Sequence, residues 1–341
     1  MKKQEKLTVE NGNATVKAKK TRRMAICYDF DHTLSPDDMQ TFSLIPSFGI
    51  DSEEFWSEAN DLAINHIMDK NLAWMFELVK YSKFKEKSLR REYFKQVGAE
   101  VPLYEGVEEW FDLVNAYAAK FDIEVEHYII SSGLKEIIEG NVIAKHMKYI
   151  YASSYLYSAD GIAEWPAQSV NYTTKTQFLF RIAKGILEEY DERVNNSMSR
   201  SELRIPYENI VYIGDSATDI PCMHLIRNKG GYSIGVFDPE TGNKSRVYQL
   251  FNDGRLSFYA PACYTEDSPI YRYMTQIVDE IAARETQKEE QAILQAPAEE
   301  SQRTALIQKT LDSCRNELTK EEQDLLESIL NQRIKKRVKK S

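Results

Sequence analysis

The sequence predicts an α/β fold: a doubly wound parallel sheet with an inserted helical cap and a C-terminal helical extension. Short apolar runs alternate along the chain with stretches of helical periodicity, a pattern typical of a parallel sheet covered on both faces. An all-helical stretch interrupts this alternation after the first run, and two amphipathic stretches follow the last. Ligands of such sheets bind beyond the carboxyl ends of the strands, so the polar residues that end the runs are the functional candidates.

The predicted strands are short runs rich in apolar, β-branched and aromatic residues. The most regular helical pattern between two of them covers residues 175–187, KTQFLFRIAKGIL. The strands are expected at residues 24–30, 125–131, 147–153, 209–215 and 232–237.

Four regions follow from these patterns. Residues 1–23 are polar, basic and without periodicity, which predicts a disordered tail. A core is expected at residues 24–35 and 104–265, and the helical cap at residues 36–103 separates its two parts. Residues 266–341 are predicted to form the C-terminal helical extension.

The extension is predicted to contain two amphipathic helices. Leu306 and Ile307 belong to the apolar stripe of the first, and Thr319 with Glu322 offers a capping box for the second. The stretch 285–300, rich in Gln, Glu and Ala, is interpreted as a link before them. Because exposed apolar stripes are rare on soluble proteins, we expect these helices to pack within the protein or in a homo-oligomer.

Composition and charge exclude several classes of function. The chain has 341 residues and is 42% hydrophobic, enough for a sizeable core. Its net charge is −9, but residues 1–23 and 333–341 each carry a net +6, which leaves −21 for the rest. Such an acidic body argues against nucleic acid as a ligand. The sequence has no apolar run long enough for a membrane span and no secretory signal, so we expect a cytoplasmic protein with no membrane partner.

Two motifs with candidate catalytic residues follow predicted strands. DFDHTLS places Asp29 and Asp31 directly after the first strand, where one carboxylate can act as a nucleophile and the other as an acid or base. Taken alone, the pair is equally compatible with two turn residues. Ser131 ends the second strand, and Gly133 permits a tight turn, so a hydroxyl and free backbone N–H groups can hold phosphate oxygens there.

Two further motifs complete the set. Lys175 lies near the start of a predicted helix that Thr173 or Thr174 would cap, an unfavourable place for a cation unless an anion compensates it. Alone, it would be read as a solvated lysine. In VYIGDSATDIP, Gly214 and Asp215 end a strand and Asp219 follows. Carboxylates gathered at strand ends repel one another unless a hard cation such as Mg²⁺ lies among them.

The four motifs together resemble the haloacid dehalogenase-like (HAD) hydrolase superfamily, and most closely its phosphoserine phosphatase type. The family's DxDxT motif is matched by Asp29, Asp31 and Thr33, and its GDxxxD motif by Gly214, Asp215 and Asp219. Ser131 and Lys175 match its other two motif positions. The resemblance covers about residues 24–237 and implies a Rossmann-like core with a type-one helical cap inserted between the first and second motifs.

The resemblance also implies a mechanism. Asp29 would attack phosphorus, and Asp31 would protonate the leaving oxygen and then activate water against the aspartyl-phosphate. Ser131 and Lys175 would hold the phosphoryl oxygens. Mg²⁺ would be held by Asp29, the backbone carbonyl of Asp31 and Asp215, and Asp219 would support either the metal or Lys175. Thr33, Gly133 and Gly214 are the other supporting residues of the site.

The expected activity is Mg²⁺-dependent hydrolysis of a small phosphorylated metabolite. The phosphoserine-specific group places Glu nine residues after the nucleophile, whereas this chain has Asp38 there, so the leaving group stays open. Two alternatives remain at this stage. One is a phosphotransferase of the same family, and the other is a non-catalytic relative that acts through partner binding by its C-terminal helices.

Overall fold

The computed structural model describes residues 21–314 and 319–338. The chain divides into two compact units, Met1–Asp279 and Glu280–Ser341. The predicted tail lies outside the described residues, except for its last three. Arg22 and Arg23 correct that prediction, because both belong to the first strand. They pair with Ile123 and Glu124 of the neighbouring strand, and Arg23 Nε lies 3.0 Å from a carboxylate oxygen of Glu124.

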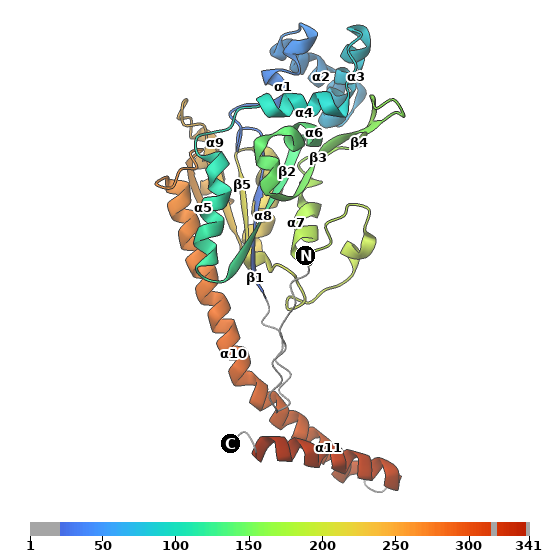
Figure 1. Cartoon of the computed structure of the whole chain (residues 1–341), viewed down its shortest axis with the longest axis vertical. Helices are drawn as coiled ribbons and strands as arrows, with labels where there is room; N and C mark the ends of the chain where they lie inside the picture. Colours follow the sequence, from blue (N-terminus) through green and yellow to red (C-terminus); the bar gives the residue numbers. More distant parts are fainter. Residues whose placement is uncertain (1–20, 315–318, 339–341) are drawn as a thin grey trace, which may run out of the picture. The chain divides into compact units, whose positions relative to one another are not determined.

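The first unit is built on a seven-stranded sheet with the order β4-β3-β2-β1-β5-β6-β7 (Figure 1). All neighbours pair in parallel except β3 and β4. This confirms the predicted fold class. The strands are β1 (Arg22–Tyr28), β2 (Ile123–Leu134), β3 (Met147–Tyr157), β4 (Ala163–Gln168), β5 (Ile210–Gly214), β6 (Tyr232–Phe237) and β7 (Phe258–Pro261).

Strands β4 and β7 were not expected from the sequence. They lie at the two edges of the sheet, where one side of a strand has no neighbour to bury it. Strand β4 accordingly contains Glu164 and Pro166, and β7 has four residues and ends at Pro261. Strand β4 lacks the apolar run that marks a central parallel strand, and β7 has apolar residues over only four positions.

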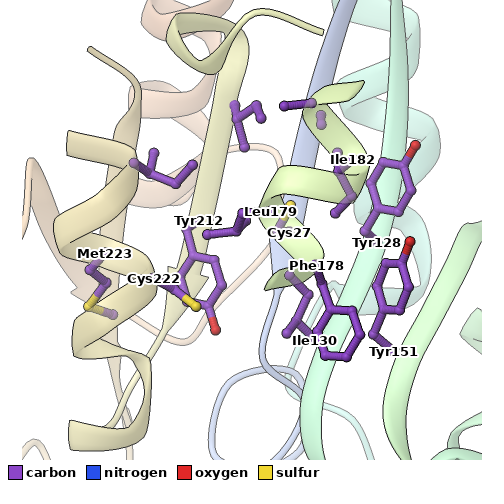
Figure 2. Close-up of a cluster of buried hydrophobic side chains, with 14 of the residues drawn as sticks. Cys27, Tyr128, Ile130, Tyr151, Phe178, Leu179, Ile182, Tyr212, Cys222 and Met223 are labelled. Atoms are coloured by element: carbon purple, nitrogen blue, oxygen red, sulfur yellow. The ribbon is translucent and has the colours of Figure 1, made fainter. Parts of the chain in front are cut away.

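One face of the sheet is covered by α7 (Lys175–Lys184) and α8 (Ile220–Asn228). Figure 2 shows this apolar cluster, in which Phe178, Leu179 and Ile182 of α7 pack against the sheet beside Cys222 and Met223 of α8. The strands contribute alternate residues to this face, as the pleat requires. These include Cys27, Tyr128, Ile130 and Tyr212.

The opposite face is covered by α5 (Val107–Ala119), whose Trp110 and Phe111 are fully buried. Between β2 and β3 lies α6 (Lys135–Gly140), and α9 (Ser245–Asn252) precedes β7. The cap contains α1 (Met39–Phe42), α2 (Ser52–His66), α3 (Lys70–Phe84) and α4 (Arg91–Glu100). Figure 1 shows these four helices at the end of the sheet where β1 finishes.

The extension forms α10 (Pro269–Cys314) and α11 (Lys320–Val338), and Thr319 precedes α11 with its N–H donated to a carboxylate oxygen of Glu322. The expected link at residues 285–300 is wrong, because α10 is continuous through it. Gln, Glu and Ala are strong helix formers, and their propensity outweighs the interruption at Pro297. No described helix has the length and apolar character needed to cross a membrane.

His127, in β2, belongs to a row of buried hydrogen-bonded side chains on the face of the sheet that α5 covers. Trp110 Nε1 donates to Tyr28 OH over 2.8 Å, Tyr28 OH lies 2.9 Å from His127 Nδ1, and His127 Nε2 lies 3.0 Å from Asn115 Oδ1. A neutral imidazole satisfies both neighbours. Burial, together with the nearby His146, lowers the pKa of His127 from 6.5 to about 3.

This histidine predicts a loss of stability in acid. Below pH 6.5 the unfolded chain takes up a proton that the folded chain resists until its own pKa of about 3. The free energy of unfolding should therefore fall through this window by about 1.4 kcal/mol per pH unit from this group. Urea unfolding at pH 7, 6 and 5 checks this: the stability gap between the native chain and His127→Gln should narrow as pH falls. A gap that stays constant over this pH range would contradict it.

Candidate active site

Asp29 follows β1 and is held in place by the adjacent strand and by its own turn. Its backbone N–H donates to the carbonyl oxygen of Ile213 in β5 over 2.9 Å. Its Oδ1 accepts a hydrogen bond from the N–H of Phe30 over 2.8 Å. The side chain is buried. The hydrogen bond from Phe30 fixes Oδ1, and Oδ2 points toward side chains of neighbouring elements.

Lys175 joins Asp29 to Asp219. Its Nζ lies 2.7 Å from Asp29 Oδ2 and 2.7 Å from Asp219 Oδ1, and its side chain is fully buried. Burial opposes the charged lysine, but Asp219 and Asp29 outweigh it and raise the pKa of Lys175. Burial likewise opposes ionised Asp219, yet Lys175 and further hydrogen bonds hold its pKa below the usual value. A cation that would be unfavourable at a helix start thus has two anionic partners.

Neither Thr173 nor Thr174 caps α7 through its side chain as predicted, and Asn171 holds the turn before the helix instead. Thr174 is the residue before the helix, as expected, but its side chain makes no capping hydrogen bond to the helix. Instead Asn171 Oδ1 accepts from the N–H groups of Thr173 and Thr174 over 3.0 Å each. Asn171 therefore orients the turn that carries Lys175.

Asp215 completes an acidic cluster. Ligand oxygens of Asp29, Asp215 and Asp219 all lie within 4.8 Å of one another. Burial and mutual repulsion, with Lys175 opposing, raise the pKa of Asp29 to about 8, and burial and Asp219 raise that of Asp215 to about 7. A hard cation among these oxygens would relieve that repulsion, and carboxylates are the ligands that Mg²⁺ prefers. The donor set therefore fits the predicted metal.

Both oxygens of Asp219 are already engaged. Besides Lys175, Oδ1 accepts from Tyr212 OH over 2.7 Å, and Oδ2 accepts from the N–H of Ser216 over 3.2 Å. Gly214 leaves space for this carboxylate, because a Cβ at that position would lie 2.5 Å from Asp219 Oδ2. The arrangement favours Asp219 as a support for Lys175. The oxygens of Asp215 have longer contacts, 3.5 Å with Thr33 and 3.4 Å with Arg246, which a cation can replace more readily.

Asp31 lies on the side of the site toward the cap. His32 adopts a left-handed backbone (φ 55°), which turns the chain after Asp31. Asp31 Oδ1 accepts a hydrogen bond from the N–H of Met39, the first residue of α1, over 2.8 Å. Burial, with Asp38 and Asp29 nearby, raises the pKa of Asp31 well above its usual value. Burial therefore favours the protonated form of this carboxyl group relative to that of an exposed aspartate.

Ser131 and Gly133 lie inside β2, which runs on to Leu134, so the predicted turn at Gly133 is wrong. Gly133 supplies space instead: a Cβ there would lie 2.1 Å from Met39 Cε and 3.0 Å from Asp31 Oδ2. Ser131 is fully buried, and its hydroxyl oxygen accepts the N–H of Gly133 over 2.9 Å. The second motif thus lies beside Asp31.

Four residues that support the site were not predicted from the sequence: Tyr212, Ser216, Arg246 and Tyr264. Tyr264 OH donates to the carbonyl oxygen of Thr33 over 2.8 Å. Thr33 itself was predicted, and its hydroxyl group donates to Asp215 Oδ1 over 3.5 Å. Arg246, from α9, lies 3.4 Å from Asp215 Oδ2. Tyr212 had a weak signal, a hydroxyl at alternate spacing from Gly214 in an apolar strand. Ser216, Arg246 and Tyr264 had none, because nothing local distinguishes them from surface or core residues.

Known proteins similar to this chain include one relative in sequence and several solved structures. An uncharacterized protein of Borreliella burgdorferi is 28% identical over 278 residues, covering 74% of this chain and 95% of that protein. A HAD family hydrolase from Salmonella enterica serovar Typhi has a TM-score of 0.49 at 16% identity, covering 75% of this chain and 71% of that one. A probable phosphoserine phosphatase from Vibrio cholerae has a TM-score of 0.48 at 14% identity, covering 78% and 67%.

The family itself is shown by the sequence match. Residues 26–224, more than half of the chain, match the haloacid dehalogenase-like hydrolase family. The matched segment begins inside β1 and ends in α8, so it contains all four motifs together with the cap. The prediction made from those motifs is confirmed, and the chain belongs to the haloacid dehalogenase-like hydrolase family.

Proposed function

We propose that this protein is a Mg²⁺-dependent phosphatase that hydrolyses a small phosphomonoester through an aspartyl-phosphate on Asp29. The observation that carries the proposal is the buried ammonium group of Lys175, 2.7 Å from both Asp29 and Asp219. This places a fixed positive charge beside a candidate nucleophile at a strand end. An anionic substrate in an acidic protein needs such locally supplied charge.

In the first step, an oxygen of Asp29 attacks phosphorus and forms the aspartyl-phosphate while the bond from phosphorus to the leaving oxygen breaks. Asp31, whose raised pKa favours its protonated form, donates a proton to that leaving oxygen. Asp31 then accepts a proton from the water that attacks the phosphoryl group. Hydrolysis releases inorganic phosphate and restores the Asp29 carboxylate.

Lys175 and Ser131 hold the phosphoryl oxygens during both steps. The hydrogen bond of Ser131 Oγ with the N–H of Gly133 leaves its own hydroxyl hydrogen available for a substrate oxygen. Asp29, Asp215 and the backbone carbonyl of Asp31 would hold Mg²⁺. Bound Mg²⁺ supplies positive charge that offsets repulsion between the anionic nucleophile and the anionic ester.

The cap favours a small substrate. Its helix α1 contacts Asp31 directly through the N–H of Met39, so the group that protonates the leaving oxygen lies under the cap. A lid in this position excludes bulky phosphorylated macromolecules and bulk water. We therefore propose a phosphorylated metabolite as the substrate class.

A panel of phosphorylated metabolites assayed with Mg²⁺ tests the proposal. We expect release of inorganic phosphate from at least one of them, loss of activity on chelation, and recovery with Mg²⁺. Ca²⁺ should restore little, because its larger, more variable coordination disturbs the in-line geometry. Full activity in excess chelator would contradict the metal assignment. Phosphate delivered to an added alcohol in preference to water would favour the phosphotransferase alternative.

A further inference from the structure

A set of hydrogen bonds joins the cap to the loop that precedes α7. Asp69, directly before α3, accepts from Ser169 Oγ over 3.0 Å and from Asn171 Nδ2 over 2.9 Å. Asn71 Nδ2 donates to the carbonyl oxygen of Val170 over 2.6 Å. We call these five residues, Asp69, Asn71, Ser169, Val170 and Asn171, the latch. About a hundred residues separate its two halves in the sequence.

Asp69 uses its two oxygens for different tasks. Oδ1 caps α3 by accepting the N–H groups of Asn71 and Leu72 over 3.0 and 3.1 Å, and it also takes the bond from Ser169. Oδ2 takes the bond from Asn171. Burial opposes the ionised carboxyl group, but the donors, Asn171 first among them, hold the pKa of Asp69 below its usual value. The side chain is therefore an ionised acceptor for both the cap and the loop.

In the core, Asn171 connects Asp69 to the turn that carries Lys175. Its Oδ1 accepts the N–H groups of Thr173 and Thr174, and its carbonyl oxygen accepts the N–H of Lys175 over 2.9 Å. The same side-chain amide thus donates to Asp69 through Nδ2 and, through Oδ1, accepts the N–H groups of the turn that leads into α7. A change in its orientation moves the turn from which the Lys175 side chain extends.

A second branch reaches the other residue proposed to hold phosphate. The N–H of Val170 donates to Ser153 Oγ over 3.0 Å, and Ser153 Oγ donates to the carbonyl oxygen of Ser132 over 3.0 Å. Ser132 is the neighbour of Ser131 in β2. The loop at residues 169–171 is therefore linked through Ser153 to the backbone beside Ser131, and through Asn171 to that of Lys175.

We propose that Asp69 is a positioning residue, and that its bond to Asn171 makes the placement of Lys175 depend on a docked cap. This rests on the proposed phosphatase function, in which Lys175 holds the phosphoryl group. With the cap docked, the loop is fixed and Lys175 is aligned. With the bond broken, the loop and the first turn of α7 gain freedom, and alignment is lost.

Asp69→Asn separates the two tasks of this side chain. Asn is as good an N-cap as Asp, so α3 keeps its cap. The substituted side chain has one carbonyl oxygen and one amide group, and the amide cannot accept from the amide of Asn171. Asn171→Asp is the reciprocal change, because it keeps an acceptor for Thr173 and Thr174 but places two carboxylates opposite each other. The double variant restores one N–H···O bond with donor and acceptor exchanged.

The matched control is Asp51→Asn. Asp51 caps α2 by accepting the N–H of Glu53 over 2.8 Å, so it is an N-cap in the same cap region. This variant makes the same Asp-to-Asn change at a helix N-cap that has no part in the hydrogen bonds between the cap and residues 169–171.

Two readouts are measured for each variant: kcat and KM with p-nitrophenyl phosphate and Mg²⁺, and hydrogen exchange of the amides of residues 170–176. Asp69→Asn should lower kcat about tenfold, with a smaller change in KM, and speed exchange in this segment about tenfold, as expected for one charge-assisted hydrogen bond. The double variant should recover most of both losses, and Asp51→Asn should match the native protein.

The proposal is contradicted if Asp69→Asn leaves hydrogen exchange in residues 170–176 unchanged, even where activity falls. Asp69 would then affect activity without changing the loop before α7. The proposal is equally overturned if the double variant is no better than the single ones. Because exchange needs no turnover, the outcomes stay separate from the proposed function. Faster exchange with reciprocal rescue in a protein that hydrolyses no phosphate ester would support the coupling and refute the phosphatase.

Discussion

Asp29→Asn should abolish turnover, by a factor of about 10⁴ or more, while the protein stays folded. The amide has almost the shape of the carboxylate, and its carbonyl oxygen can still accept from Phe30 N–H or from Lys175. What it lacks is the anionic oxygen that attacks phosphorus. Rates of phosphate release, together with thermal unfolding of the same preparation, check both parts of the expectation.

Asp37→Asn is the matched control for this variant. Asp37 is an exposed carboxylate in the loop that follows the DFDHTLS motif, and it has no proposed part in the reaction. Its substitution should leave activity close to native. An Asp29→Asn protein that retains more than a few per cent of native activity after rigorous purification would exclude Asp29 as the nucleophile. Acid-quenched native protein should carry a phosphoryl group that Asp29→Asn lacks.

Lys175→Met should remove activity and also destabilise the fold. The substitution leaves Asp29 and Asp219 buried near each other without the ammonium group that lies 2.7 Å from each. Removing one partner of a buried charge pair typically costs about 3–5 kcal/mol. Urea unfolding in the absence of divalent cations should show a loss of this size, and added Mg²⁺ should recover part of it, since a cation offsets the repulsion.

Two comparisons make the Lys175 expectation specific. Lys184→Met, in the same helix, removes an ammonium group that donates to the carbonyl oxygens of Val194 and Asn196, and should leave activity largely intact. Combining Lys175→Met with Asp219→Asn should recover stability without activity, because one of the two repelling charges is removed. A stable, active Lys175→Met protein would contradict both the charge argument and the phosphate-holding role.

Much of the fold could be predicted from local pattern. The five central strands and the helix that carries Lys175 have the apolar periodicity of buried elements, because a strand or helix between two packed layers is apolar wherever it meets them. The edge strands β4 and β7 could not be predicted in this way, because each has a neighbouring strand on one side only and is short or contains proline. The link expected at residues 285–300 is instead part of the continuous α10, because Gln, Glu and Ala favour a helix strongly enough for it to continue through Pro297.

The sequence by itself determined the chemistry available at the site. Asp29 and Asp215 follow apolar strands, and the carboxyl ends of parallel strands meet at one edge of a sheet, so their proximity follows from pattern alone. Only the tertiary structure decided that the ammonium group of Lys175 pairs with the carboxylates of Asp29 and Asp219. Lys175 meets Asp219 across two packed elements, and Asp69 meets Asn171 across about a hundred residues. Such contacts depend on how helices and loops pack in three dimensions, and no spacing along the chain encodes that packing.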